Sequence, residues 1–214
     1  STDIHLGKEK IETVGEAKLL GTTITNNLSW NKNTSILVRQ GNIRMQFLHR
    51  ASKYTSNIRD LKQIYISQIR SKLKQSAVVW HSSLTQKNEN DLERIQKAAL
   101  KVIMKDKYQN YSDALMTLKI KSLKDRREEL CLKFAKSCLK MEKFKKFFPL
   151  NKKDHSMSMR KSEKFALEKY GSVRYRDSAL PYMKRLLNKY QVDKNNLFKA
   201  LSTVPMNYGT SPYH

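Results

Sequence analysis

The chain has 214 residues, and its 43 Lys and Arg against 19 Asp and Glu give a formal net charge of +24. So large an imbalance disfavours a compact state by self-repulsion unless a polyanion neutralises it, and nucleic acid is the commonest such partner. No run approaches the roughly 18 apolar residues of a membrane-spanning helix, and the N-terminus has no charged-then-apolar secretory signal.

The N-terminal region is predicted to begin with β-structure. Its β-branched residues predict two short strands, residues 10–14 and 17–24, joined at Gly15-Glu16 and followed by turn residues 25–27. From Thr34 the hydrophobic period becomes helical and is expected to end near Tyr54. The face expected to be buried consists of Ile36, Leu37, Ile43, Phe47, Leu48 and Ala51.

Two longer helices are predicted next. The first covers residues 58–80, and its buried side consists of Leu61, Ile64, Tyr65, Ile69, Leu73 and Trp80. The second begins near Gln86, where acidic residues in the early turns suit the helix dipole. Its apolar stripe consists of Leu92, Ile95, Ala99 and Val102. Tyr65 and Trp80 could serve as base-stacking platforms, but their place on the apolar side favours core packing.

The remaining elements are also helical. After a polar break at 105–110, a short helix is predicted over 111–118, and Ser122 is expected to cap a long helix to about Lys146. Residues 149–163 form the predicted linker. A further helix covers 178–189, with Asp177 or Ser178 as cap, and a short one covers 195–201. The fold class is therefore mainly α, with an N-terminal β-hairpin, a helical bundle and a helical C-terminal tail.

Residues suited to catalysis or metal binding do not form a recognisable set. No two of the five histidines have the i, i+4 spacing of metal ligands on one helix. Cys131 and Cys138 do not form a C-x-x-C pair and are interpreted as buried thiols in a reducing compartment. No adjacent Asp pair suggests a two-metal site. We therefore expect no catalytic residue, metal or cofactor in this chain.

Basic residues form stripes on two of the predicted helices. At 100° per residue, Arg59, Lys62, Arg70 and Lys74 fall within an arc of about 120°. Arg94, Lys97, Lys101 and Lys105 form a ridge opposite the Leu92 stripe. Phosphate contact is the favoured interpretation, and an ordinary solvated face is the alternative. The predicted nucleic-acid-binding residues are Arg39, Arg44, Arg50, Arg59, Lys62, Arg70, Lys74, Arg94, Lys97, Lys101, Arg126 and Arg127.

An ordered series of short motifs resembles one protein family. Residues 17–24 followed by Leu28-Ser29-Trp30, then the run 92–100, then Arg126-Arg127-Glu128-Glu129-Leu130 and finally residues 174–182, occur in this order. The series is similar to the region after the catalytic palm in reverse transcriptases of non-LTR (LINE-type) retrotransposons, especially the jockey-like group. The resemblance extends from about residue 10 to about residue 190.

The resemblance implies an organisation and a function. Residues 1–30 would be a hairpin like the primer grip at the end of the palm, with Leu19, Leu20 and Gly21 at its centre. Residues 31–148 would be a thumb-like bundle, and residues 164–214 a C-terminal tail. The family's metal-binding aspartates belong to a palm expected to precede residue 1. Mg²⁺ is thus expected only for a full-length polymerase.

The resemblance also implies the partners. We expect a non-catalytic C-terminal part of an RNA-directed DNA polymerase that binds an RNA–DNA or DNA duplex and element RNA, and that contacts its own palm and fingers. The expected location is intracellular, nuclear or cytoplasmic, and not on a membrane. The alternative is a domesticated retrotransposon fragment that acts as a protein-interaction module.

Overall fold

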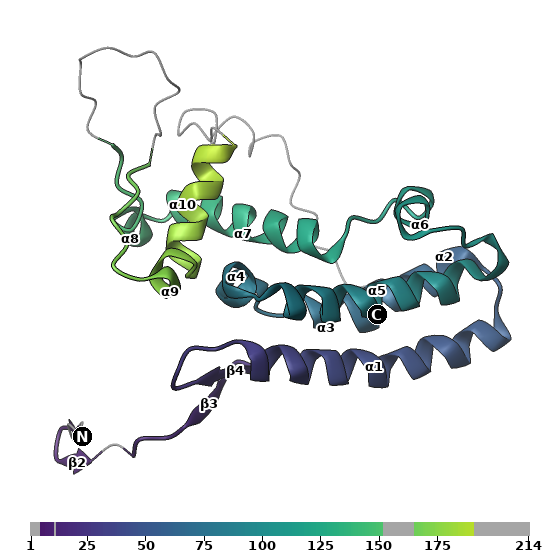
Figure 1. Cartoon of the computed structure of the whole chain (residues 1–214), viewed down its shortest axis with the longest axis horizontal. Helices are drawn as coiled ribbons and strands as arrows, with labels where there is room; N and C mark the ends of the chain where they lie inside the picture. Colours follow the sequence, from purple (N-terminus) through teal and green to yellow (C-terminus); the bar gives the residue numbers. More distant parts are fainter. Residues whose placement is uncertain (1–4, 11, 152–164, 191–214) are drawn as a thin grey trace, which may run out of the picture. The chain divides into compact units, whose positions relative to one another are not determined.

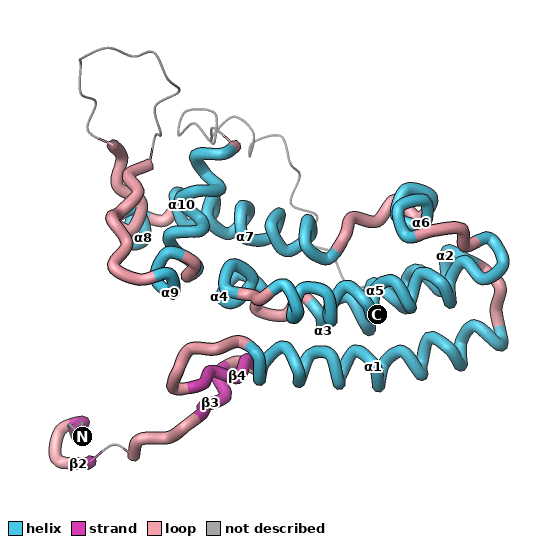
Figure 2. The backbone as a smooth tube through the Cα atoms, in the orientation of Figure 1, coloured by secondary structure: helices cyan, strands magenta, loops and turns pink. Residues whose placement is uncertain are grey.

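The protein is mainly helical, with two-stranded antiparallel hairpins at its N-terminal end, which confirms the predicted fold class (Figure 2). The computed structural model describes residues 5–10, 12–151 and 165–190. The chain divides into two compact units, residues 1–130 and 131–214. Most of the predicted linker 149–163 and the predicted helix 195–201 lie outside the described residues. Within the described ranges, no helix is both long enough and apolar enough to cross a membrane.

The N-terminal β-structure differs in register from the prediction. Strands β1 (His5–Leu6) and β2 (Glu9–Lys10) pair, and β3 (Glu16–Leu19) pairs with β4 (Thr22–Thr25). The predicted pairing of 10–14 with 17–24 is wrong, because the chain reverses at Leu20-Gly21 and not at Gly15-Glu16. Leu20 and Gly21 both have positive φ, +48° and +78°. This combination suits a two-residue turn between twisted antiparallel strands.

Helix α1 (Asn31–Tyr54) runs alongside α5 (Gln86–Met104) in the first unit (Figure 1). The two helices pack closely at Gly41, where an added Cβ would lie 2.8 Å from Ile95 Cδ1. The residues that α1 buries are Asn33, Thr34, Leu37, Gly41, Met45 and Leu48.

The predicted buried face of α1 was partly wrong. Ile43 is 55% exposed and Phe47 is 69% exposed. On a 100° spacing these two side chains point about 100° away from Leu37 and Leu48, so α1 carries two apolar rows and buries only one. The row containing Gly41 is buried because its small residue permits the close approach of α5.

Residues 58–80 do not form the single helix that was predicted. Helix α2 (Ile58–Ile64) continues into a π-helical segment, η1 (Tyr65–Arg70), and then into α3 (Ser71–Leu73). The chain then turns through Ser76, whose φ is +53°, before α4 (Ala77–Trp80) and a 3-10 turn, η2 (His81–Ser83). The predicted apolar side is nevertheless buried at Leu61, Tyr65, Ile69, Leu73 and Trp80.

The last elements of the first unit follow the prediction closely. Helix α5 is followed by a 3-10 turn, η3 (Lys105–Lys107), and by α6 (Tyr111–Thr117). Ser122 caps α7 (Leu123–Lys140), since its Oγ accepts from Asp125 N at 3.0 Å and donates to Asp125 Oδ2 at 2.7 Å. The helix ends six residues before the predicted Lys146, because Met141 adopts an extended conformation before α8 (Glu142–Lys145).

The second unit contains the end of α7, α8, α9 (Val173–Arg176) and α10 (Ala179–Lys189). Its core includes Met183, Leu186 and Leu187 of α10. Lys184 is also buried, and its Nζ donates to Glu168 Oε1 at 2.6 Å. Both cysteines are buried thiols, as predicted. The Ser178 side chain, although at the N-cap position, does not cap α10 but donates to Tyr175 O at 2.7 Å.

Candidate nucleic-acid interface

The twelve cations predicted to contact phosphate differ in how exposed they are in the structure. Two of them, Arg70 and Arg127, are buried. Four more, Arg44, Lys62, Lys74 and Arg126, are half-buried. The exposed residues, which can reach a phosphate without any rearrangement of the fold, are Arg39, Arg50, Arg59, Arg94, Lys97 and Lys101.

The α5 ridge consists of Arg94, Lys97 and Lys101, which lie on the exposed side of α5. Arg94 pairs with Asp91 at 3.4 Å across one turn. Lys97 Nζ lies 5.3 Å from the centre of the Tyr111 ring, and Lys101 Nζ lies 5.5 Å from that of Tyr108. These contacts are weak at an exposed site, so all three cations can turn toward a polyanion at little cost.

Lys105, the fourth member of the predicted ridge, differs from the other three because its ammonium is hydrogen-bonded within the protein. Its Nζ donates to Ser52 O at 2.8 Å and to Ser56 Oγ at 3.2 Å. It thus joins the end of α5 to the end of α1 and the loop that follows, and its backbone φ is +48°. The ridge that is available to a ligand therefore ends at Lys101.

A groove of about 420 Å³ lies between α1 and α5. Arg39 lines its α1 side, and Asp91, the partner of Arg94, lines its α5 side. The amides of Asn42, Gln46 and Asn88 also line it, among other residues. Amide side chains and arginines are common contacts to phosphates and sugars. The fold thus places Arg39 beside the start of the α5 ridge, an arrangement that sequence spacing could not indicate.

Arg70 is not a surface cation, so its burial does not favour the predicted phosphate contact. The side chain is buried, and Nη2 donates to Lys121 O at 2.6 Å. Burial lowers the pKa of its guanidinium, although the nearby Tyr65 acts in the opposite direction. Arg70 is therefore a weaker candidate for phosphate contact than the exposed cations.

Arg70 belongs to a buried polar network that connects α5 to its neighbours. Tyr65 donates to Gln96 Oε1, and Gln96 Nε2 donates to Tyr111 Oη at 2.7 Å and to Lys121 O at 3.2 Å. Glu93 accepts from Tyr111 and, at 3.1 Å, from Leu123 N. Glu93 and Gln96 therefore fix the start of η1, α6 and the start of α7 around α5. Buried polar groups that are hydrogen-bonded to one another in this way favour one arrangement of a core.

Two tyrosines of this network stay protonated. Burial, the main cause, raises the pKa of Tyr65 well above its usual range. The pKa of Tyr111 is raised first by burial and then by its hydrogen bond to Glu93. Both hydroxyls are therefore protonated and can act as donors at neutral pH.

Arg127 is buried as well, so the structure does not favour its predicted role as a phosphate contact either. Its Nε donates to His81 Nδ1 at 3.3 Å, and its guanidinium carbon lies 5.8 Å from the centre of the Trp80 ring. Burial and the adjacent Arg127 lower the pKa of His81 to about 4. His81 is thus a neutral acceptor at physiological pH. Trp80 donates through Nε1 to Gln75 O at 2.9 Å and is a core residue, as the sequence favoured.

A second group of cations gathers beside the hairpin, and sequence reasoning missed two of its members. Burial and the charges of Arg44 and Lys18 lower the pKa of Lys72. Lys18 and Lys72 line a hollow of about 410 Å³ between β3, α1 and α3. Lys72 lies in a basic stretch, residues 39–74, which contains nine Lys and Arg and one acidic residue, but no sequence signal places Lys18 next to it. Together the three cations form a place where a phosphate would relieve mutual repulsion.

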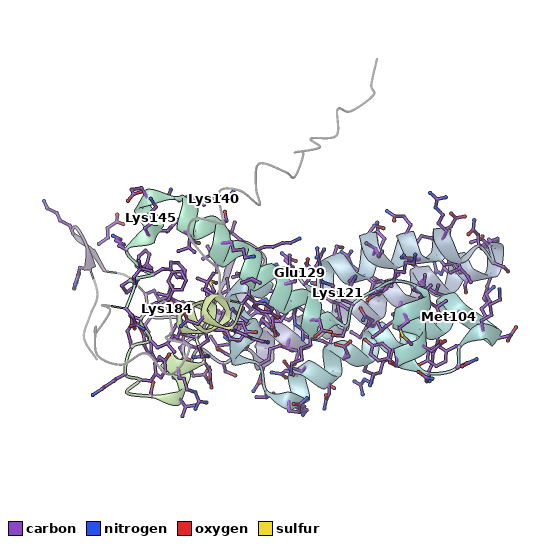
Figure 3. The ribbon with its side chains drawn as sticks, turned by 90° about the horizontal axis from the view of Figure 1, so that it is seen from above. Met104, Lys121, Glu129, Lys140, Lys145 and Lys184 are labelled. Carbon is purple, nitrogen blue, oxygen red and sulfur yellow. The ribbon has the colours of Figure 1, made fainter. Side chains whose placement is uncertain are left out.

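A third group lies where α3 meets the start of α7. Burial, followed by the charges of Arg126 and Arg70, lowers the pKa of Lys74. Arg126 also pairs with Glu129 at 2.8 Å. Lys121 pairs with the same carboxylate at 3.4 Å, and Figure 3 labels both residues. Because Glu129 neutralises part of this group, it is a weaker candidate for phosphate binding than the α5 ridge.

The residues expected to resemble a primer grip lie at the tip of the β3–β4 hairpin. Leu19 is 61% exposed and Leu20 is 87% exposed. Gln75 Nε2 donates to Leu20 O at 3.2 Å, and an added Cβ at Gly21 would lie 2.4 Å from that same nitrogen. The Thr23 amide donates to Asn33 Oδ1 at 3.2 Å. The hairpin is thus tied to α1 and to the segment after α3, with two leucines facing solvent.

Comparison with known proteins gives no family. No protein-family model matches the chain, and no significant match was found among curated proteins or solved structures. Function is therefore inferred from the chain's own side chains.

Proposed function

We propose that this chain is the non-catalytic C-terminal part of a non-LTR retrotransposon reverse transcriptase, and that it binds template–primer nucleic acid through residues 31–130. The observation that carries the proposal is the α5 ridge next to the Arg39 groove, in a chain of net charge +24. The expected ligands are an RNA–DNA or DNA duplex and element RNA. The expected protein partner is the palm and fingers of the same polymerase, inside the cell.

The charge geometry suits backbone contact. Six exposed cations from the predicted set are available, Arg39, Arg50, Arg59, Arg94, Lys97 and Lys101. Contacts of this kind position a duplex and carry no sequence information. Binding is therefore expected to tolerate any duplex sequence and to weaken steeply with salt.

A fluorescence-anisotropy titration of an RNA–DNA duplex at several salt concentrations tests the binding. Neutralising about six to eight phosphates gives a slope of log affinity against log salt of about −5 to −7. A slope near zero, or no binding at low salt, would refute the proposal. A matched titration with a duplex of scrambled sequence should give the same affinity.

A separate assay tests whether the chain can polymerise DNA. Primer extension with the purified chain and Mg²⁺ should give no incorporation above background. Incorporation would show that this chain contains a polymerase site. The sequence encoded upstream of Ser1 discriminates further, since an in-frame palm with paired aspartates favours the polymerase.

A second candidate function is supported by one observation. The outer row of α1 exposes Ile43, Phe47 and Tyr54, the last by 92%. Large apolar side chains in a row on a helix are typical of a surface that packs against another protein. This row favours a protein-interaction module, as in a domesticated fragment, whose gene would carry a start codon and a regulatory region before Ser1.

A further inference from the structure

The second unit carries a surface on which lysines and phenylalanines alternate. Lys143 Nζ lies 5.2 Å from the centre of the Phe144 ring, and Lys146 Nζ lies 5.3 Å from that of Phe147. The two ring centres are 6.5 Å apart. Phe147 is 43% exposed, although burial of a ring of this size would stabilise the fold. Neither the duplex surface of residues 31–130 nor the core accounts for these two rings.

The support beneath Phe147 is well fixed. Phe148, the next residue, is buried, and its amide donates to Lys145 O at 3.0 Å. The Phe147 amide donates to Phe144 O at 3.1 Å. Just beyond, Ala166 N donates to Pro149 O at 2.9 Å. The exposed ring thus projects from a backbone that is held on both sides, so it loses little freedom when a ligand contacts it.

The charge around the two rings is almost entirely positive. Residues 133–151 contain six lysines and one acidic residue, Glu142, a net charge of +5. Glu142 pairs with Lys145. Figure 3 labels Lys145 and Lys140, which lie on either side of the break between α7 and α8. An apolar protein partner alone would leave these charges unmatched, whereas a polyanion would match them.

We propose that this surface, defined by Lys143, Phe144, Lys146 and Phe147, binds single-stranded nucleic acid, with one unpaired base stacked on Phe147. The Lys146 ammonium lies over the Phe147 ring, 5.3 Å from its centre, so a base that stacks on this face displaces it, and the flexible lysine can then pair with the phosphate of that nucleotide. Bases within a duplex are already stacked, so a free ring of this kind selects single strands. The proposal concerns residues 131–151 and does not depend on duplex binding by residues 31–130.

The test separates stacking from charge. The full chain is titrated with an oligouridylate of about twelve nucleotides and with an abasic oligomer of equal length and charge. The wild-type chain should bind the uridine oligomer more tightly. Phe147→Leu keeps an apolar side chain but removes the ring, so it should reduce that preference about 5-fold to 150-fold. Phe147→Trp should retain or increase the preference, because its larger ring also stacks.

Phe47→Leu is the matched control, since Phe47 is also an exposed phenylalanine, 69% by area, but lies on α1. It should leave the preference for bases unchanged. Equal binding of the two oligomers by the wild-type chain, or an unchanged preference in Phe147→Leu, would overturn the proposal. So would tighter binding to phosphatidylserine vesicles than to the uridine oligomer, which would assign the surface to a membrane.

Duplex binding is measured in the same variants. Phe147→Leu should bind an RNA–DNA duplex as the wild-type chain does. If the wild-type chain preferred the uridine oligomer but bound no duplex, that result would count against the proposed duplex surface and not against this one.

Discussion

Residues 86–104 and residues 58–80 carry the same sequence pattern, an apolar stripe opposite a row of cations, yet only the first forms one regular helix. In α5 the cations Arg94, Lys97 and Lys101 all lie on the exposed side, as predicted. In the second region η1 interrupts the helix, and Arg70 lies in the core. Helical spacing therefore predicts the direction of a side chain only where the helix is uninterrupted.

The physical reason lies in the π-helical segment. A π-helix has more residues per turn than an α-helix, so each residue advances by less than 100°. Every residue after Tyr65 is thus rotated relative to the position that an α-helix would give it. Arg70 turns toward Lys121 O, and Tyr65 stays directed at Gln96. The interruption is what brings a tyrosine and an arginine of one segment into the same buried network.

Removal of core side chains from α5 should have the largest effect. Leu92 is fully buried, and Ile95 is 3% exposed and lies against Gly41. Leu92→Ala and Ile95→Ala are each expected to lower the free energy of unfolding by about 2–5 kcal/mol. Urea denaturation followed by circular dichroism measures this, with the exposed Lys101→Ala as control, expected within about 0.5 kcal/mol. A loss below about 1 kcal/mol at Leu92 would mean that the site collapses around the cavity.

His81, at the end of the interrupted region, should make stability depend on pH. Its pKa is lowered to about 4 by burial and by Arg127, so the folded state favours the neutral form. This stabilisation is complete above pH about 6.5, and it is lost as pH falls toward 4. The pKa difference corresponds to about 3 kcal/mol at most. Denaturation between pH 7 and 5 measures how the free energy of unfolding depends on pH. His81→Gln should remove the part of this dependence that lies above pH 5. If the free energy of unfolding of that variant depended on pH as strongly as that of the wild-type chain, the dependence would come from carboxylates.

Arg70 and Arg59 provide the direct comparison within the interrupted region. Arg70→Gln removes a buried charged donor from Lys121 O and should cost about 1.5–3 kcal/mol of unfolding free energy. Arg59 is exposed, so Arg59→Gln should change the free energy of unfolding by no more than about 0.5 kcal/mol. If the two variants were equally stable, the guanidinium of Arg70 would contribute nothing to the network.

Sequence alone predicted the elements whose signals are local. Ser122 with Asp125 caps α7, acidic residues precede the ridge of α5, and the bounds of α6 agree to one residue. The hairpin turn was misplaced because Gly15 and Gly21 are both plausible turn residues. Only the packing of Gly21 near Gln75 distinguishes them, and that contact joins residues 54 positions apart.

The candidate site was less predictable than the fold. Exposure of Arg94 follows from the period of one helix, but burial of Arg127 depends on Trp80 and His81, which lie in a different element. The groove beside Arg39 likewise needs α1 and α5 together. Glu93 and Gln96 were interpreted as parts of a helix and not as network members, because no residue near them in sequence is their main partner.

Substitution of the α5 ridge is expected to have the smallest effect on stability. Changing Arg94, Lys97 and Lys101 together to Gln removes one exposed ion pair with Asp91 and two exposed contacts with tyrosine rings. Exposed pairs of this kind contribute about 0–1 kcal/mol each, so the variant should stay folded. Its duplex affinity should nevertheless fall, and the slope of log affinity against log salt should flatten by about three units, because three phosphate contacts are lost.

The result distinguishes a functional ridge from a solvated face. Gln is shorter than Arg or Lys but keeps a polar, hydrogen-bonding end without the positive charge, so a flatter slope would report the lost charges. Arg59→Gln, from the other basic row, serves as the binding control and should flatten the slope by about one unit if it also contacts a phosphate. A folded triple variant with an unchanged slope would place the phosphate contacts elsewhere, first of all at Lys18, Arg44 and Lys72 beside the hairpin, where burial and then the charges of Arg44 and Lys18 lower the pKa of Lys72.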